Sequence, residues 1–326
     1  MGPEFKLIDA FVAAAGVSPR APAGPGDDAA LIRRPRGQTC LTVDALVDGV
    51  HFRRATSRLQ DVGHKALAVN LSDLAAMGAR PLWALVALGI PRGFSTGAAR
   101  ALGAGFGLLA RQSGTALVGG NVTRSPGLTL TVTLGGAVGH GRALLRSGAR
   151  PGDLLWVSGT LGDARLGLAL LERPAGAEAR RLGPHPRLAR AALERQRRPS
   201  PRLSLGRALV GVASACIDVS DGLVQDAGHV AQASRVALHL ALEDLPCSAA
   251  LVAACPSPLE RARMAASGGE DYELLFTAPR SRTTAVRRLA RRLGLPLTLV
   301  GEVRRGRGVH VVGASLGALR GFDHLT

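Results

Sequence analysis

The sequence predicts a mixed α/β fold in which strands and helices alternate and pack in layers. Short apolar stretches suited to buried strands recur between segments that repeat apolar residues at helical spacing. The 326 residues are enough for two domains, each with a core of its own. A run of Gly and Pro, RSGARPGD, begins at Arg146 and interrupts the alternation, so we expect a domain boundary near residues 140–150.

The first half alternates stretches typical of strands with stretches typical of helices. The expected strands cover residues 38–47, 81–90, 115–119 and 127–138, and the expected helices cover residues 61–79 and 94–112. The helix over 61–79 is apolar on nearly all sides, which indicates that it is buried.

The second half continues the alternation after the Gly and Pro run. The expected elements are, in order, the strand LLWVSG, the helix GDARLGLALLE, a connection rich in Pro and Arg over residues 183–202, the strand and helix within VASACIDVSDGLVQDAGHVAQASR, the strand ELLFTAP, an amphipathic helix with the Arg-rich run 287–294, and two strands around Val300 and Val309. This succession again favours a layered α/β or α+β domain.

Basic residues dominate the charge of the chain, with 41 Lys and Arg against 24 Asp and Glu and a formal net charge of +17. Clustered basic residues are typical of nucleic-acid-binding proteins. Here only two of them are lysines, the arginines are spread along the chain, and aromatic residues, which stack on bases, make up 3%. We therefore expect no nucleic acid as the main partner; such a partner would need tight, salt-sensitive binding.

Neither a membrane span nor a targeting signal is expected. The apolar stretches 81–91 and 125–139 are too short, or too rich in Thr, Gly and Pro, to span a bilayer. The start MGPEFKLIDAF contains acidic residues and no long apolar run. The four cysteines form no Cys-x-x-Cys pair, which fits a reducing compartment. We expect a cytoplasmic protein.

Several well-known catalytic motifs are missing. Neither lysine lies in a Gly-Lys-Ser/Thr sequence, so a Walker A loop is excluded. The motif set of protein kinases is absent, as are a recognisable Ser-His-Asp set and a His-Glu-x-x-His motif. An enzyme of this sequence needs another kind of site.

Acidic residues in apolar or Gly-rich surroundings are the first indication of such a site. They occur in the segments GPGDDAALI, LTVD, NLSDLAAMG, ACIDVSDGL and SGGEDYELL, none of which contains a basic residue. A buried carboxylate needs a compensating partner, and Mg²⁺ is usually held by a few carboxylates together with substrate phosphates. Each acid could instead cap a helix or form a turn, but that explanation weakens when it must hold for all of them.

A glycine pair supplies the second indication. Gly119 and Gly120 follow an apolar strand in LVGGNVTRSPG, where backbone N–H groups can approach an anion without a Cβ in the way. Beside the acidic segments and Arg146, this pair favours a site for a metal and a nucleotide. Phosphoryl transfer needs little else, because it depends mainly on positioning and charge neutralisation. His51 is a possible substrate contact or a structural histidine.

Eight ordered motifs give the chain a resemblance to a known family. They are EFKLI, GDDAAL, TVDALVDGVHF, HKALAVNLSDLAAMGARP, GGNVTR, RSGARPGD, IDVSDGL and SGGEDYELLF. In this order and spacing they closely resemble the thiamine-monophosphate kinases of the aminoimidazole-ribonucleotide-synthetase-like superfamily. The resemblance covers nearly the whole chain, and NLSDLAAMGA together with SGGEDYEL is its most specific part.

The resemblance implies the fold and the reaction. The fold would have an N-terminal ATP- and Mg-binding domain over 1–142, whose sheets pair in a homodimer, and a C-terminal α/β domain over 143–326. The active site would lie between the domains and hold several Mg²⁺ ions. The reaction would be ATP-dependent phosphorylation of thiamine monophosphate to thiamine diphosphate, by direct in-line transfer without a phosphoenzyme.

The resemblance also implies roles for individual residues. The catalytic carboxylates would be Asp73, Asp218 and Asp221. The metal ligands would be Asp28, Thr42, Val43 through its backbone, Asp44, Asp73, Asn121, Asp218 and Asp221. ATP would contact Gly120, Asn121, Arg146 and Ser220, and the thiamine substrate would contact His51, Glu270 and Leu319.

Two positions depart from the pattern of the family. Asn121 stands where the family has an Asp, so one negative charge is missing and we expect weaker binding of that metal. Leu319 stands where the family places a Trp against the thiamine rings, and leucine offers no π face for the thiazolium cation. Two alternatives therefore stay open: an enzyme of the same scaffold with a different acceptor, and a non-catalytic paralogue that binds nucleotide or thiamine phosphates.

Overall fold

The computed structural model describes residues 3–16, 29–32 and 36–312. The chain forms two compact units. Unit 1 comprises residues 1–74 and 79–141, and unit 2 comprises residues 75–78 and 142–326. Both units combine a sheet with helices, so the expected mixed α/β class is confirmed.

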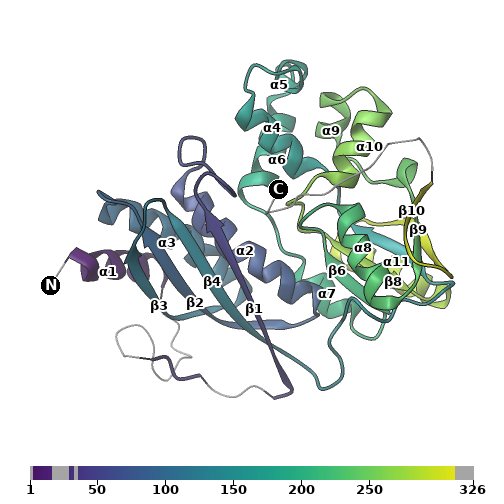
Figure 1. The fold of residues 1–326 in the computed structure, drawn as a ribbon, viewed down its shortest axis with the longest axis horizontal. Helices are drawn as coiled ribbons and strands as arrows, with labels where there is room; N and C mark the ends of the chain where they lie inside the picture. The colour runs from purple at the N-terminus through teal and green to yellow at the C-terminus, as the bar shows by residue number, and fades with distance from the viewer. Residues whose placement is uncertain (1–2, 17–28, 33–35, 313–326) are drawn as a thin grey trace. The chain divides into compact units, whose positions relative to one another are not determined.

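Unit 1 contains a four-stranded sheet (Figure 1). Its strands are β1 (Gln38–Val47), β2 (Arg80–Ile90), β3 (Ala116–Arg124) and β4 (Thr129–Val138), in the order β1-β4-β2-β3. The central pairs β1/β4 and β2/β4 are antiparallel, whereas β2 and β3 run parallel. The strands β1 and β3 therefore form the two edges of this sheet.

The helices of unit 1 are α1 (Pro3–Ala15), α2 (Leu59–Ala76) and α3 (Thr96–Ser113). As expected, α2 is buried over nearly its whole length. Ser95 caps the start of α3 by accepting a hydrogen bond from the Ala98 N–H, and Gly114 ends it in the left-handed conformation, φ 73°. The helix α3 also packs tightly against α1.

The two faces of this sheet differ in burial. Val86 and Val132 lie in register with Asp44, and both valines are buried. The alternate positions point the other way, and Leu41 and Val43 of β1 remain 62% and 59% exposed. Leu85 of β2 shares this second face and is also exposed. We call this second face the open face of unit 1.

Unit 2 contains a six-stranded sheet. Its strands are β5 (Leu154–Ser158), β6 (Ala215–Asp218), β7 (Ala237–Ala241), β8 (Leu274–Ala278), β9 (Leu297–Arg304) and β10 (Gly308–Val312), in the order β10-β7-β9-β5-β8-β6. Among the described strand pairs of this sheet, only β7 and β10 run parallel. The strands β5, β6 and β8 are buried along their whole length, which makes them the centre of the core.

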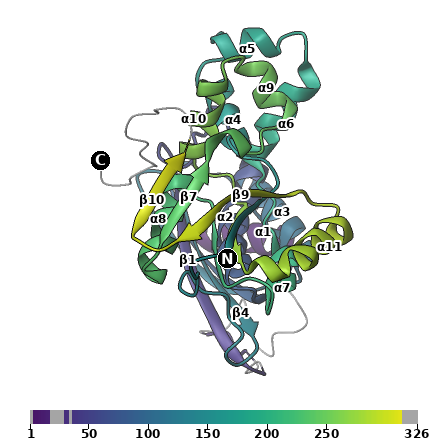
Figure 2. The same ribbon diagram turned by 90° about the vertical axis from the view of Figure 1, so that its right-hand side faces the viewer.

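Eight α-helices surround this sheet within the described residues. They are α4 (Asp163–Glu172), α5 (Ala177–Leu182), α6 (Pro186–Arg197), α7 (Leu203–Leu209), α8 (Leu223–Ser234), α9 (Ala249–Ala254), α10 (Pro258–Ser267) and α11 (Thr283–Leu293). Figure 2 shows α4, α5, α6 and α9 gathered together, and they share a small core that includes Leu166, Leu182 and Leu251. The helix α8 packs over a larger core on the sheet.

The end of α2 belongs to the core of unit 2. Ala75 and Ala76 pack in one cluster with Trp156 and Leu205. A Cβ on Gly206 would lie 1.9 Å from the Ala75 carbonyl oxygen, so α7 and the end of α2 touch through their backbones. One helix therefore contributes residues to both units.

Residues 183–202 are not only a connection, as was expected from their Pro and Arg content. Most of this segment forms α6. Pro186 occupies the first turn, where a missing N–H costs nothing, and arginine is a good helix former. Ala192 is buried against the small core, so an apolar stripe holds the helix in place. The sequence patterns also did not predict α1, α5, α7, α9, α10 or β7.

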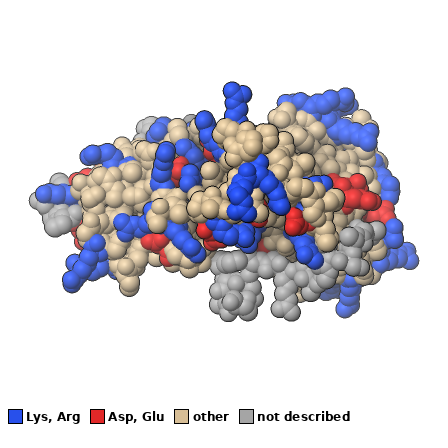
Figure 3. All heavy atoms as spheres, turned by 90° about the horizontal axis from the view of Figure 1, so that it is seen from above, with Lys and Arg blue, Asp and Glu red and all other residues tan. Residues whose placement is uncertain are grey.

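The surface charge follows the scattered pattern of the sequence. On the face in Figure 3, Lys and Arg side chains are dispersed, with acidic side chains between them. Within the part of the chain that the structure describes, no helix has the length and apolar character needed to cross a bilayer.

Candidate functional site

In unit 1, the oxygen ligands expected from β1 and α2 lie together. The Thr42 hydroxyl donates a hydrogen bond of 2.5 Å to Oδ2 of Asp73. Asp44 lies two residues further along β1, on the same face of the sheet, and its side chain is exposed. Burial, and then the charge of Asp73, raise the pKa of the Cys40 thiol, which places the carboxylate near this strand as well. We call Thr42, Asp44 and Asp73 the oxygen cluster of unit 1.

The glycine pair lies inside a strand and not after one. The strand β3 runs on to Arg124, with Gly120 in register with Val86 and Asn121 in register with the exposed Ala87. A Cβ on Gly120 would lie 2.0 Å from the Val86 carbonyl oxygen, so no side chain fits there. Asn121 is exposed and shares the open face of unit 1.

Asn121 and the oxygen cluster are therefore apart within one chain. They belong to opposite edge strands, with β4 and β2 between them. At about 4.8 Å per strand, three steps amount to about 14 Å. They also lie on opposite faces of the sheet.

His51 is held by its own segment and by a buried lysine. Its Nδ1 accepts a hydrogen bond of 3.1 Å from the Val47 N–H, so the neutral ring carries its proton on Nε2. The Lys65 ammonium donates to the His51 carbonyl oxygen at 3.3 Å. Lys65 is only 3% exposed and lies on α2. Nothing in the sequence pattern around Lys65 indicated this contact.

In unit 2, the turn between β6 and α8 contains three of the expected residues. Asp218 ends β6 and is buried, and Ser220 and Asp221 follow at half-buried positions. One carboxylate oxygen of Asp226 accepts hydrogen bonds from the backbone N–H groups of this turn. The donors are Ser220, Asp221 and Gly222, at 3.0, 3.1 and 3.2 Å.

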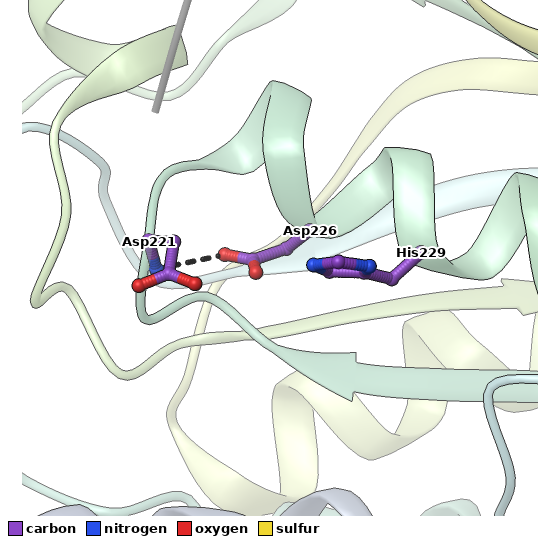
Figure 4. Close-up of side chains that lie close together, drawn as sticks. All are labelled: Asp221, Asp226 and His229. Carbon is purple, nitrogen blue, oxygen red and sulfur yellow. Dashed lines mark hydrogen bonds between the residues drawn. The ribbon is translucent and has the colours of Figure 1, made fainter. Parts of the chain in front are cut away.

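Asp226 is a site residue that the sequence analysis missed. It is 2% exposed, and burial and the charge of Asp221 raise its pKa to about 7 against the opposing effect of the three N–H groups. Figure 4 shows its carboxylate between Asp221 and His229. One ligand atom from each of the three lies within 4.8 Å of the others. The position of Asp226 could have indicated this role, because it is an acidic residue in the first helical turn after Asp-Gly. Such residues often accept hydrogen bonds from the N–H groups that precede the helix.

A second segment brings Glu270 to the same turn. The Glu270 N–H donates to the Ser220 carbonyl oxygen at 2.7 Å, and the Tyr272 N–H donates to the Val219 carbonyl oxygen at 2.8 Å. Two segments that are distant in the sequence therefore place Ser220, Asp221 and Glu270 side by side. Gln196 of α6 also donates to Oε2 of Glu270, at 2.6 Å.

Protein groups compensate the neighbouring acids Asp271 and Glu273, so these two need no cation, contrary to the expectation for the segment SGGEDYELL. Asp271 accepts hydrogen bonds from the Gly162 and Ala164 N–H groups at the start of α4, at 2.7 and 3.3 Å. Glu273 is fully buried and pairs with the guanidinium groups of Arg195 and Arg202. These partners are far away in the sequence, so inspection of neighbouring residues could not find them.

Arg146 lies in a loop that is hydrogen-bonded to Ser234, the last residue of α8. The Ser234 hydroxyl donates to the Arg146 carbonyl oxygen at 3.0 Å and accepts from the Gly148 and Ala149 N–H groups at 3.1 Å each. The Arg146 side chain is exposed. The two remaining expected residues, Asp28 and Leu319, lie outside the described residues.

The donor atoms of both groups fit a hard divalent cation. Thr42, Asp44 and Asp73 offer hydroxyl and carboxylate oxygens, and so do Asp218, Ser220 and Asp221. Mg²⁺ binds through oxygen, usually with one or two carboxylates and the phosphates of a substrate. Each group can therefore bind Mg²⁺ together with a phosphate.

Comparisons with known proteins identify the family of the chain. Residues 26–138 match the family of the AIR synthase related protein, N-terminal domain, and residues 150–313 match its C-terminal domain. The thiamine-monophosphate kinase of Escherichia coli (strain K12) is 43% identical over 282 residues, which cover 86% of this chain and 83% of that protein.

Solved structures give the same result. The thiamine-monophosphate kinase from Stenotrophomonas maltophilia K279a has 45% identity and a TM-score of 0.86, over 96% of this chain and 97% of that one. AaThiL complexed with AMPPCP and TMP has 34% identity and a TM-score of 0.78, over 98% of this chain and 95% of that one. The chain has the two-domain fold of these proteins and belongs to the thiamine-monophosphate kinase family.

Proposed function

We propose that this protein transfers the γ-phosphoryl group of ATP to the phosphate of thiamine monophosphate and so forms thiamine diphosphate. The observation that carries the proposal is the turn after β6, where Ser220, Asp221 and Glu270 lie side by side. In the roles that we assign to them, these residues would join a nucleotide contact, a metal ligand and a substrate contact in one place. The related structure with AMPPCP and TMP supports the same pair of substrates.

Mg²⁺ would neutralise the phosphate charge that develops during transfer. The residues that would hold it are Asp28, Thr42, the Val43 carbonyl, Asp44, Asp73, Asn121, Asp218 and Asp221. Of these, Thr42 and Asp73 already share a hydrogen bond, so their oxygens are pre-oriented. Asp73, Asp218 and Asp221 are the carboxylates on which transfer depends most.

The remaining residues would bind and orient the two substrates. Gly120 would contact ATP through its backbone, Ser220 and Asn121 would offer hydrogen bonds, and Arg146 would neutralise charge. His51, Glu270 and Leu319 would contact the thiamine part. The acceptor oxygen belongs to a phosphate that is largely ionised at pH 7, so no side chain needs to act as a base. Positioning and charge neutralisation then provide the catalysis.

The protein would act as a homodimer through unit 1. The open face leaves Leu41, Val43 and Leu85 exposed, and a second copy would cover them. A two-fold axis can bring the β3 edge of one copy to the β1 edge of the other. The edge strand that carries Asn121 in one copy would then lie beside the edge strand that carries Thr42 and Asp44 in the other, whereas the two edges are about 14 Å apart within one chain.

A cytoplasmic location fits these substrates. Among the described residues the four cysteines are free thiols.

The proposal is tested by incubating the protein with ATP, MgCl₂ and thiamine monophosphate and separating thiamine diphosphate by chromatography. We expect product from the wild type and from Asp244→Asn, an exposed acid of unit 2. Asp73→Asn, which keeps the shape of the side chain but removes its charge, should lower turnover at least 100-fold, about 2.7 kcal/mol.

Two other outcomes would contradict the proposal. Product formed from a different acceptor in a panel of small molecules would point to a relative on the same scaffold. ADP and Mg²⁺ that raise the melting temperature without any product would point to a non-catalytic paralogue, which the uncharged Asn121 would favour.

A further inference from the structure

The segment that carries Glu270 has a strained backbone. Glu270 and Tyr272 have φ angles of 67° and 50°, in the left-handed region that side chains rarely adopt. Such conformations persist only where surrounding contacts enforce them. The contacts that enforce this segment therefore also decide where the Glu270 carboxylate lies.

Several of these contacts come from the end of α6. Arg195 donates to the Asp271 carbonyl oxygen at 3.0 Å and to Oε1 of Glu273 at 2.7 Å. The next residue, Gln196, donates from Nε2 to Oε2 of Glu270 at 2.6 Å. Arg195 thus holds the backbone of the segment, while Gln196 holds the side chain of Glu270.

The amide of Gln196 can take only one orientation here. Gln196 is 6% exposed, and its Oε1 is buried without a hydrogen-bond partner among the described residues. Turning the amide over would place Oε1 against the Glu270 carboxylate, where two acceptors repel. A buried acceptor without a donor is unfavourable, so an apolar side chain of similar length would fit the pocket better. The short hydrogen bond to Glu270 is therefore the contact that explains why an amide occupies this position.

We propose that Gln196 is a positioning residue that fixes the Glu270 carboxylate for the thiamine part of the acceptor. It would set the affinity for the acceptor and leave the affinity for ATP unchanged. This inference rests on the proposed function. It concerns the acceptor alone because Gln196 reaches the site only through Glu270 among the contacts described.

The test compares steady-state constants of the whole protein and its variants. Gln196→Met keeps the length of the side chain and removes the donor, and Gln196→Glu places a second carboxylate against Glu270. We expect the KM for thiamine monophosphate to rise about tenfold in Gln196→Met, because one hydrogen bond to a charged group is lost. The rise should be larger in Gln196→Glu. The KM for ATP should stay within twofold.

The matched control is Glu194→Gln on the same helix. Among the described residues, the Glu194 side chain forms only a long ion pair with Arg190, 3.9 Å, and both side chains are exposed. All constants of this variant should equal those of the wild type. If methionine at position 196 prevents folding, Gln196→Asn, which draws the amide back by one methylene, takes its place.

A double-mutant cycle with Glu270→Ala decides the mechanism. If Gln196 acts through Glu270, then Gln196→Met should not change the KM for thiamine monophosphate further once Glu270 is alanine. Additive effects, equal rises in both KM values, or a variant that changes only the melting temperature would overturn the inference.

Failure of the proposed function would be visible separately. A wild type that binds thiamine monophosphate without turning it over contradicts the proposed function alone. The same cycle is then run on the dissociation constant of thiamine monophosphate, measured by calorimetry, with the same expected pattern. A wild type that does not bind thiamine monophosphate overturns both.

Discussion

One carboxylate oxygen of Asp226 accepts three successive backbone N–H groups and so fixes the Ser220–Gly222 turn. Replacement by alanine would leave these three donors, of which Gly222 is buried and the other two are half-buried, without this acceptor. We expect Asp226→Ala to lower the free energy of unfolding by about 2–4 kcal/mol, since bonds to a charged group contribute about 1.5–3 kcal/mol each and water can replace some of them. Urea denaturation measures this change.

The control for Asp226 is the exposed acid Asp244. Asp244→Ala should change the free energy of unfolding by less than about 0.5 kcal/mol. Asp226→Asn, which keeps one acceptor oxygen, should fall between the two. Equal stability of Asp226→Ala and the wild type would mean that the turn does not need this carboxylate.

Asp271 predicts a dependence of stability on pH. Burial raises its pKa to about 8, although the Gly162 N–H and Arg195 act in the opposite direction. Between about pH 4, near the pKa of an unfolded aspartate, and pH 8, the folded protein keeps a proton that the unfolded chain releases. The protonated Asp271 therefore makes its full contribution to the free energy of unfolding below about pH 4, and this contribution decreases as the pH rises to about 8.

Denaturation of the wild type and Asp271→Asn at several pH values checks this dependence. Asparagine cannot titrate, so the variant should show a flatter decrease in the free energy of unfolding over this range, whatever its absolute stability. Identical slopes for both proteins would contradict a raised pKa.

Individual residues could be predicted only where neighbours in the sequence reveal them. The motif IDVSDGL pointed to Asp218, Ser220 and Asp221, and the structure places Glu270 beside this turn. Arg195 could not be found in this way, because its partner Glu273 is 78 positions away. A pairing at such a distance depends on the packing of α6, which the sequence analysis did not predict.

At the scale of elements, the glycines of α3 allow close contact with other segments. A Cβ on Gly105 would lie 1.8 Å from the Gln60 carbonyl oxygen, whereas a Cβ on Gly97 would meet only Ser95 Oγ at 3.7 Å. We expect Gly105→Ala to destabilise the protein by about 2 kcal/mol or more, because the backbones must separate.

Gly97→Ala is the matched change in the same helix. It should leave stability unchanged or raise it by up to about 1 kcal/mol, the difference in helix propensity. Melting temperatures of both variants provide the comparison. A tolerated Gly105→Ala would show that α3 can shift without loss.

The predicted elements were most accurate where apolar periodicity was clear. The strand expected over 38–47 coincides with β1, and the buried helix over 61–79 corresponds to α2. The prediction was wrong where residue types suggested a loop but long-range packing decided otherwise. Pro186 and the many arginines suggested a connection where α6 forms. The glycine pair suggested the end of a strand where β3 continues to Arg124.

For the whole molecule, the open face of unit 1 predicts the oligomeric state. The double variant Leu41→Lys and Val43→Lys places two charges where an apolar partner surface is proposed. We expect the wild type to sediment as a dimer and the double variant as a monomer with little turnover. Analytical ultracentrifugation and the thiamine diphosphate assay measure the two effects.

Val252→Lys is the control, because Val252 is also an exposed apolar residue, 47%, but lies on α9 of unit 2. It should remain dimeric and active. A wild type that is monomeric at all concentrations and fully active would contradict the dimer.

The class of the fold could be predicted from the sequence, whereas the arrangement of its strands could not. Alternating apolar stretches indicated the layers, and these are confirmed. The order β10-β7-β9-β5-β8-β6 depends on which strands pair across long connections. Local patterns contain no information on such pairing. This is also why the sequence could not reveal that Asn121 and Asp44 lie on opposite edges of one sheet.

Because α2 contributes residues to the cores of both units, the chain cannot be divided at residue 142 without loss. A fragment that starts at residue 142 lacks Ala75 and Ala76, which lie in the cluster with Trp156 and Leu205. It would expose that cluster to water and tend to aggregate. Recombination with a single crossover could therefore not exchange the two halves as modules. A gene that encodes unit 2 alone would need a new segment in place of the four residues 75–78.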